Sequence, residues 1–208
     1  MNCDVAQIQT LVMNSGGLRS MVATAMAIQD VGVEAVGLLH ISDGRSNATR
    51  RKVAFEKQAE HYKIGQRHVL PMPHLFGLEQ GRFDEWPLIG VVRPQLLFAA
   101  GQVARTLRAK TLIWPLSCDG DDRLIALASE QMIICEHLAQ IEGMIAPGVD
   151  APLLELTDVQ LVEIAAQLDA PLAMAFSCET KDETPCGNCP ACRRRQSAFD
   201  AAHVLHAA

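Results

Sequence analysis

The sequence predicts an α/β fold: one parallel sheet covered by helices on both faces, followed by a small C-terminal lobe. Apolar, β-like runs alternate with segments of helical periodicity along most of the chain, which is typical of βαβ units. Four cysteines within fifteen residues near the C-terminus end that alternation. We therefore expect an α/β domain over residues 1–170 and a cysteine-rich lobe over residues 171–208 that packs on it.

The first third of the chain predicts three strands and two helices. An apolar run over residues 5–13 ends at the turn Asn14-Ser15-Gly16-Gly17, and a helical stretch begins at Leu18 and stops near Gly32. Residues 33–41 are apolar almost throughout, as in a strand that is buried on both faces. A charged helix is expected over residues 48–62, and a third strand over residues 67–72.

The rest of the chain predicts a loop, three helices and a fourth strand. Prolines and glycines make residues 73–92 an irregular segment with room for one short helix. A helix begins at Pro94, because proline suits the first helical turn, and a strand follows over residues 111–116. A further helix is expected over residues 124–141. Thr157 and Gln160 form a capping box for a helix that ends near Leu168.

Composition and charge exclude several classes of protein. Among 208 residues, 18 basic and 24 acidic side chains leave a formal charge of −6, which does not suit a general nucleic-acid binder. The longest stretch without Asp, Glu, Lys or Arg covers fourteen residues, 5–18, and a membrane helix needs about 20. Asp4 precedes the first basic residue, Arg19, which is unlike a secretory signal. We expect a cytoplasmic protein whose cysteines are not a secreted disulfide framework.

The cysteine cluster has the spacing of a metal site. Its members are separated by seven, two and two residues, and they are Cys178, Cys186, Cys189 and Cys192. Two intervening residues let both sulfurs of a pair point at one centre, with Gly187 supplying turn freedom. Four thiolates match a closed structural Zn²⁺ site. An iron–sulfur cluster and a disulfide cluster are the alternatives that spacing leaves open. The other cysteines, Cys3, Cys118 and Cys135, are expected to be ordinary thiols.

The turn after the first strand predicts a phosphate site. Small residues let backbone N–H groups approach a phosphate, and the start of the following helix adds its dipole. The hydroxyl groups of two serines could donate further hydrogen bonds. The spacing is not that of a Walker A loop. The candidate nucleotide-binding residues are Ser15, Gly16, Gly17, Leu18, Arg19 and Ser20.

Together, the two ends of the chain resemble one family. The turn is similar to the SGGxDS pyrophosphate loop of the adenine-nucleotide alpha-hydrolase-like ATP pyrophosphatases. The tail resembles the zinc tail of the 7-cyano-7-deazaguanine synthase family within that group, as does the stretch over residues 152–157. The matching tail residues are Ser177-Cys178 and Pro185-Cys186-Gly187-Asn188-Cys189-Pro190-Ala191-Cys192, with Arg195.

The resemblance implies a HUP-like, Rossmann-like fold with a five-stranded parallel sheet, a structural zinc lobe and a homodimer. It also implies a ligase of queuosine biosynthesis that uses MgATP. Such an enzyme activates 7-carboxy-7-deazaguanine as an adenylate, converts it to an amide with ammonia, and dehydrates the amide to 7-cyano-7-deazaguanine. The implied partners are ATP and a 7-deazapurine-like substrate, without a membrane or a bulk nucleic acid.

The sequence departs from the family where chemistry is expected. Arg19 stands in place of the aspartate of the loop, and a cation does not bind Mg²⁺. It could pair with a phosphate or a carboxylate, or point into solvent. Other family motifs are altered at residues 42–46, 93–95 and 118–123; a one-residue shift would let Asp43 take the role of an acidic residue there. No catalytic residue is assigned.

These departures leave other functions open. One alternative is a homologue with altered or lost activity that keeps the scaffold for binding a nucleotide or a partner. Another is a related ligase that acts on a different carboxylate. His40 lies in an apolar strand pattern and is expected to be a hydrogen-bonded core histidine rather than a catalytic base. Arg195 is a candidate for a basic spot beside the metal lobe.

Overall fold

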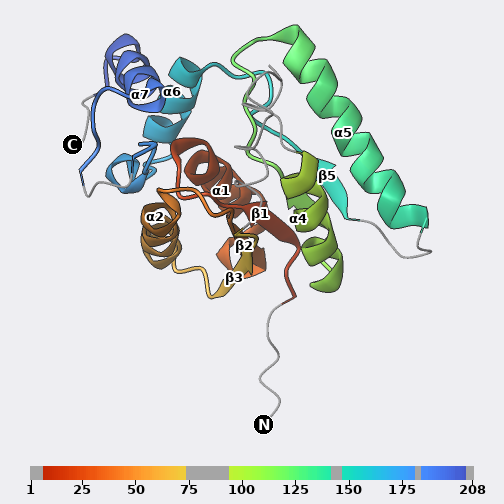
Figure 1. Cartoon of the computed structure of the whole chain (residues 1–208). Helices are drawn as coiled ribbons and strands as arrows, with labels where there is room; N and C mark the ends of the chain where they lie inside the picture. The colour runs from red at the N-terminus through yellow and green to blue at the C-terminus, as the bar shows by residue number, and fades with distance from the viewer. Residues whose placement is uncertain (1–6, 74–93, 142–146, 181–183, 205–208) are drawn as a thin grey trace.

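A five-stranded parallel sheet forms the centre of the molecule (Figure 1). The computed structural model describes residues 7–73, 94–141, 147–180 and 184–204. The strand order is β3-β2-β1-β4-β5, and all four neighbouring pairs are parallel. The predicted α/β class is confirmed. After β3 the chain crosses to the other side of β1, where β4 and β5 are added, so the strand order reverses between β1 and β4. Ligands of open α/β sheets bind at the carboxyl ends of the strands at such a point.

Three of the four predicted strands are shorter in the structure, and the third is shifted by one residue without a change in length. They are β1 (Thr10–Met13), β2 (Val36–Ser42), β3 (Gln66–Pro71), β4 (Thr111–Ile113) and β5 (Gly148–Asp150). The expected second strand begins late because residues 33–35 form a short 3-10 helix, η1 (Val33–Ala35). β5 was not predicted, because only its central residue, Val149, is buried. The start of the predicted first strand, the loop over residues 74–92, Cys3 and Arg93 lie outside the described residues.

Five of the six α-helices named here were predicted. They are α1 (Leu18–Val31), α2 (Ala48–His61), α4 (Pro94–Thr106), α5 (Asp122–Ile141) and α6 (Asp158–Gln167). The capping box of α6 is confirmed, since Thr157 accepts from the Gln160 N–H and Gln160 accepts from the Thr157 N–H. The unpredicted helix is α7 (Pro190–Ala201), which begins at the last cysteines and has Cys189 as its N-cap.

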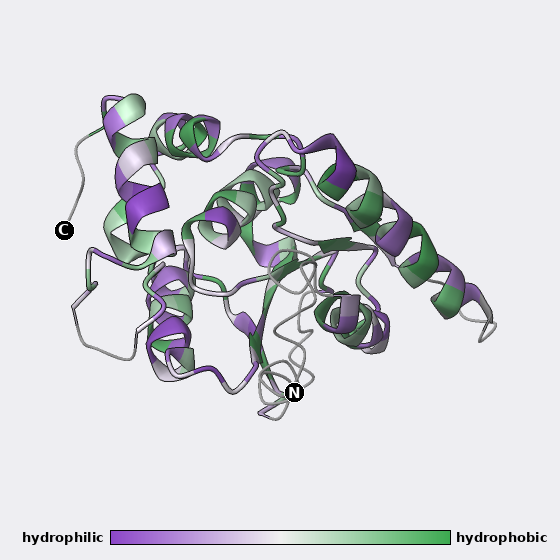
Figure 2. Ribbon diagram, turned by 45° about the horizontal axis from the view of Figure 1, so that its top comes forward, coloured by the Kyte–Doolittle hydropathy of each residue, from purple (hydrophilic) through white to green (hydrophobic). Residues whose placement is uncertain are grey.

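Two hydrophobic cores flank the sheet, and alternate residues of β1 enter each of them. Val12 packs in a core with residues of α1, α2, α6 and α7, whereas Leu11 packs in a core with residues of α4 and α5. Figure 2 shows hydrophobic strands in the middle and helices of mixed character around them. Among the described residues, no helix has the length and apolar character needed to cross a membrane.

The C-terminal helix shares a core with the sheet domain. Phe199 of α7 is fully buried in the same cluster as residues of α1 and α6. A short 3-10 helix, η2 (Leu172–Met174), and an extended segment lead from α6 toward the cysteines. The helix that follows the last cysteines therefore packs with α1 and α6, and the division of the chain into a domain and a lobe at residue 170 stays a prediction.

Candidate functional site

The glycine turn lies at the carboxyl end of β1, beside the point where the chain changes direction in the sheet. Gly16 has φ +77°, and a Cβ at this position would collide with the carbonyl oxygen of Arg51. Only glycine suits both conditions. The Gly16 carbonyl accepts a hydrogen bond of 2.9 Å from the Phe176 N–H. The turn is thus held between α2 and the segment that leads to the cysteines.

Two buried amide side chains hold the turn in place. Asn14 Oδ1 accepts from the Gly16 N–H at 2.8 Å, and Asn14 Nδ2 donates to Thr24 Oγ1 and Gln58 Oε1 at 3.2 and 3.1 Å. Gln58 Nε2 lies 3.0 Å from the Gly16 carbonyl oxygen and 3.3 Å from that of Met174. Both side chains are buried, so these contacts are shielded from water and set the shape of the turn.

The first turn of α1 is suited to an anion. Gly17 is the N-cap and supplies no capping side chain, and residues 18–21 contain no acidic group. Unpaired N–H groups and the helix dipole attract negative charge at such a place. Ser15 is half-buried, while the buried Ser20 Oγ lies 3.0 Å from the Gly17 carbonyl oxygen and 3.4 Å from Ser15 Oγ. The Ser20 hydroxyl therefore supports the turn in this structure.

Arg19 pairs with a carboxylate of the chain itself. Its Nη2 lies 2.8 Å from Asp158 Oδ1, at the first residue of α6. Both side chains are partly exposed, at 32% and 21%. Of the three roles that the sequence left open for Arg19, the structure shows the ion pair with a carboxylate. This pair connects the start of α1 to the start of α6, where Asp119 accepts a hydrogen bond from the Asp158 N–H.

Asp43, at the end of β2, is buried between two arginines. Its Oδ2 lies 3.0 Å from Arg45 Nε and 3.3 Å from Arg51 Nη1. Arg51 also donates from Nε to the Ser15 carbonyl oxygen at 3.2 Å. Burial lowers the pKa of Arg51, while the charge of Asp43 acts in the opposite direction. Asp43 thus orients an arginine that contacts the glycine turn.

His40 fits the expectation of a core histidine. Its Nδ1 lies 2.9 Å from the Asn14 carbonyl oxygen, and its ring stacks on Phe55 at 5.2 Å. Burial lowers the pKa of His40 from its ordinary value of 6.5. The neutral ring is therefore a supporting part of β2 beneath the glycine turn.

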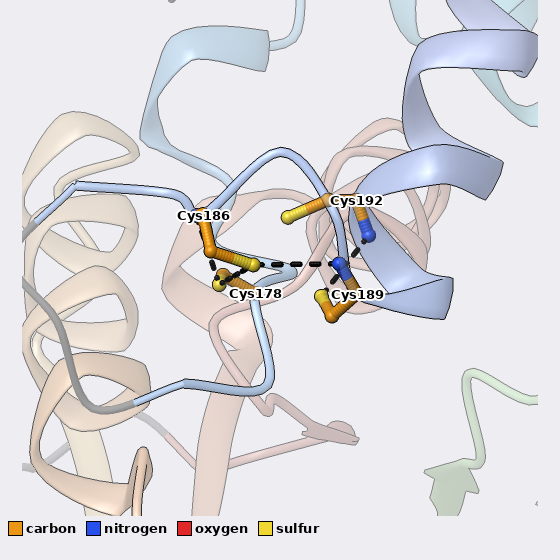
Figure 3. Close-up of side chains that lie close together, drawn as sticks. All are labelled: Cys178, Cys186, Cys189 and Cys192. Carbon is orange, nitrogen blue, oxygen red and sulfur yellow. Dashed lines mark hydrogen bonds between the residues drawn. The ribbon is translucent and has the colours of Figure 1, made fainter.

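The four predicted cysteines of the tail come together in space. Figure 3 shows their side chains turned toward one centre. All four sulfurs lie within 4.8 Å of one another, and those of Cys178 and Cys186 are 3.6 Å apart. Sulfurs in a tetrahedron about one Zn²⁺, with bonds of ~2.3 Å, lie about 3.8 Å apart. The donor set and its geometry therefore fit a single metal centre.

Backbone N–H groups support the sulfurs of this cluster. The N–H groups of Cys186, Cys189 and Cys192 each lie 3.4 Å from the sulfur of the preceding cysteine of the cluster. Burial raises the pKa of Cys178, but hydrogen bonds from Cys186 and Thr180 outweigh it and lower the pKa to about 6. Hydrogen bonds to sulfur favour the thiolate, which is the form that binds metals.

The remaining predicted residues have structural surroundings. Cys118 and Cys135 are buried free thiols, and burial raises the pKa of each. Arg195 donates to the carbonyl oxygens of Leu172 and Ala175, both at 2.9 Å, and its guanidinium lies over the Phe199 ring at 4.9 Å. Arg195 therefore fastens η2 and the following segment to α7.

Sequence reasoning missed several residues that shape the site: Asn14 as a side-chain ligand of the turn, Gln58, Arg51, Asp158 and Phe176. Gln58 alone carried a usable signal, because a glutamine among the buried residues Ala54, Phe55 and Ala59 of α2 needs internal partners. The other residues act through contacts with distant parts of the chain.

Comparisons with known proteins find relatives that match nearly the whole chain. A family model described as "Queuosine biosynthesis protein QueC" matches residues 129–203. The 7-cyano-7-deazaguanine synthase of Koribacter versatilis is 28% identical over 217 residues, covering 95% of this chain and 91% of that protein. The enzyme of the same name from Methanopyrus kandleri is 26% identical, covering 94% and 95%. A shorter match to the Methanosarcina barkeri synthase is 44% identical over 54 residues, or 26% and 23% of the two chains.

Solved structures show a limited overall likeness. The U34-tRNA thiolase NcsA from Methanococcus maripaludis, with its [4Fe-4S] cluster, has a TM-score of 0.47 and 15% identity, covering 95% of this chain and 66% of that one. NAD+ synthetase from Burkholderia pseudomallei has a TM-score of 0.46 and 11% identity, covering 96% and 75%. The similarity in sequence to 7-cyano-7-deazaguanine synthases, by contrast, runs along nearly the whole chain.

Proposed function

We propose that this protein is an ATP-dependent carbon–nitrogen ligase that converts 7-carboxy-7-deazaguanine and ammonia to 7-cyano-7-deazaguanine, in the queuosine pathway. The observation that carries the proposal is the similarity to a named synthase over 95% of the chain and 91% of that synthase. The start of α1, which has no capping side chain and no acidic residue, and the four clustered cysteines support it, because they suit an anion and a metal ion.

The glycine turn is the proposed nucleotide site. Ser15, Gly16, Gly17, Leu18, Arg19 and Ser20 would surround the phosphates of ATP. The backbone N–H groups of the first turn of α1 would donate to phosphate oxygens, and Arg19 would add a positive charge. Because Asn14 and Gln58 already hold the turn, little reorganisation is needed when the anion binds.

In the proposed reaction these residues would have two roles, which are to bind pyrophosphate and to position the α-phosphate. A carboxylate is a poor electrophile, and its conversion to an adenylate supplies a leaving group. The N–H groups at the start of α1 would hold the departing pyrophosphate and stabilise the charge that develops on it. The turn would also fix the α-phosphate relative to the acid, which converts an encounter of two molecules into a reaction within one complex.

Two aspartates near the glycine turn are already paired with arginines. Asp43 is buried between Arg45 and Arg51, and Asp158 pairs with Arg19. Mg²⁺ is usually bound through one or two carboxylates together with water molecules and substrate phosphates. We therefore assign neither aspartate as a ligand of Mg²⁺. The ion would bind together with ATP, as MgATP.

The cysteine cluster is the proposed structural zinc site, held by Cys178, Cys186, Cys189 and Cys192. Bound zinc would join the segment after η2 to the start of α7 and supply folding energy there. Elemental analysis of the purified protein is expected to give about one zinc per chain, and Cys189→Ser to lose it while Cys118→Ala keeps it. Iron with sulfide in the wild type would show an iron–sulfur cluster instead.

We also infer from the family resemblance that the protein is a cytoplasmic homodimer. Light scattering during size-exclusion chromatography measures the mass of the particle directly. A mass of twice 22.6 kDa is expected, and a mass of 22.6 kDa would contradict the dimer.

Product analysis tests the reaction. Purified protein is incubated with ATP, Mg²⁺ and ammonium, with and without 7-carboxy-7-deazaguanine. AMP and pyrophosphate are expected only when the acid is present, together with the nitrile in the mass spectrum. If the protein binds ATP and the acid but releases neither product, the scaffold has lost the reaction. If another carboxylate supports AMP release, the substrate is different.

A further inference from the structure

A pocket of about 490 Å³ lies between α2, residues 173–178 and the start of the cysteine lobe. Binding sites for small molecules occupy roughly 300–1,000 Å³, so the volume suits a bicyclic ring with one or two substituents. Figure 1 shows the elements that contribute to it, α2 and the segment that runs toward α7, on the same side of the molecule.

The wall of the pocket is largely apolar, although it faces solvent. Its apolar lining residues include Val53 and Ala54 of α2, and Phe176 and Pro185 of the segment that leads to α7. Val53 is 46% exposed. A flat apolar ring between these groups would remove their surface from water.

Positive charge surrounds this apolar wall. Arg50, Lys57 and Arg195 line the pocket, and no acidic side chain occurs among its described lining residues. The Arg50 guanidinium lies 5.5 Å from the centre of the Phe176 ring. An arginine placed against an aromatic ring can pair with a carboxylate and stack on a planar ring at once. The chemistry of the pocket thus fits a planar anion.

The pocket adjoins the glycine turn through two of its walls. The Phe176 N–H donates to the Gly16 carbonyl oxygen at 2.9 Å. Gln58 Nε2 links the same carbonyl to that of Met174, which also lines the pocket. A ligand in the pocket would therefore lie next to the proposed phosphate site and not on a remote face.

We propose that this pocket binds the acidic heteroaromatic substrate, a planar purine-like ring that carries a carboxylate, with Arg50 and Lys57 pairing with the charge and Val53 and Phe176 contacting the ring. The inference rests on the proposed function for the identity of the acid. The place where the acid binds is inferred from the pocket itself, from its positive charge and from its contact with the glycine turn.

Direct binding tests the location without any turnover. Titration calorimetry measures the affinity of 7-carboxy-7-deazaguanine in the absence of ATP. Arg50→Glu reverses the charge of the pocket, and Val53→Trp fills it. Lys52→Glu makes the same charge reversal on α2 outside the lining residues, and Val69→Trp places the same bulk at an exposed valine of β3. Thermal melting of each variant checks that it is folded.

The pocket variants are expected to weaken binding of the acid at least about tenfold, while both controls stay within about twofold of the wild type. 7-Deazaguanine, which lacks the carboxylate, is expected to bind at least about tenfold more weakly than the acid. Affinity for ATP is expected to be unchanged in every folded variant. Absence of binding to the wild type, or equal affinities in pocket and control variants, would overturn the proposal.

The two proposals fail in different ways. If the acid binds as expected but ATP is not cleaved, the pocket stands and the proposed reaction fails. If the wild type cleaves ATP with the acid and all four variants keep the same KM for the acid, the reaction stands and the pocket does not hold the substrate.

Discussion

Replacement of Gln58 by methionine tests whether the buried amide network holds the glycine turn. Gln58 is fully buried, and its side chain contacts Asn14 Nδ2, the Gly16 carbonyl and the Met174 carbonyl at 3.1, 3.0 and 3.3 Å. Methionine has nearly the same volume, so Gln58→Met removes the hydrogen bonds without leaving a large cavity.

The expected loss in the free energy of unfolding depends on which hydrogen bonds the partners of Gln58 keep. Asn14 Nδ2 still reaches Thr24 Oγ1 at 3.2 Å, and the Gly16 carbonyl still accepts from the Phe176 N–H. Two of the three partners of Gln58 therefore keep a hydrogen bond in the variant. At about 1 kcal/mol for each hydrogen bond, Gln58→Met is expected to lower the free energy of unfolding by about 2–3 kcal/mol. For a chain of this size that lowers the Tm by about 5–10 °C.

Urea denaturation followed by circular dichroism measures this loss, and titration with ATP measures its effect on the turn. Gln29→Met, at an exposed position of α1, is the matched control and is expected to change the free energy by less than about 0.5 kcal/mol. A loss below about 1 kcal/mol in Gln58→Met, or equal losses in the two variants, would refute the idea that this network determines the shape of the turn.

Three further predictions concern neighbouring residues. Gly16→Ala is expected to lose more than about 2 kcal/mol in urea denaturation, because φ +77° and the nearby Arg51 carbonyl leave no room for a Cβ; an unchanged midpoint would contradict this. Below the ordinary pKa of 6.5, the unfolded chain takes up a proton that buried His40 resists, so stability falls as the pH falls, and His40→Leu is expected to flatten that dependence in urea midpoints. Arg19→Ala is expected to weaken pyrophosphate binding in calorimetry about fivefold or more, and Asp158→Asn to strengthen it; opposite signs would remove Arg19 from the site.

The elements that the sequence predicted well are those whose signals are local. The capping box of Thr157 and Gln160 and the proline start of α4 involve neighbours in the chain, so their residue types are sufficient evidence. β5 could not be found in this way, because a three-residue strand with one buried side chain has neither a period nor an apolar run.

The same reasoning explains which parts of the site were missed. The cysteines carry their signal in their spacing, and the structure brings all four sulfurs together. Gln58 binds Asn14 from 44 residues away, and Arg19 meets Asp158 across 139 residues. Contacts of this kind depend on how helices pack over the sheet, which residue types at one position do not reveal. Gln58, a polar residue on the buried face of α2, was the one sequence signal that indicated such a contact.

The ion pair of Arg19 bears directly on the proposed chemistry. A carboxylate beside a polyphosphate would need a metal ion to offset the repulsion, whereas a guanidinium attracts the phosphate without one. Asp158 neutralises Arg19 when no nucleotide is bound, but both side chains are partly exposed, and such pairs contribute only about 0.2–1 kcal/mol. Hydrogen bonds to charged groups contribute about 1.5–3 kcal/mol, so a triphosphate can compete with Asp158 for Arg19. In the proposed site Arg19 would therefore be compatible with ATP binding, because it would neutralise phosphate charge directly.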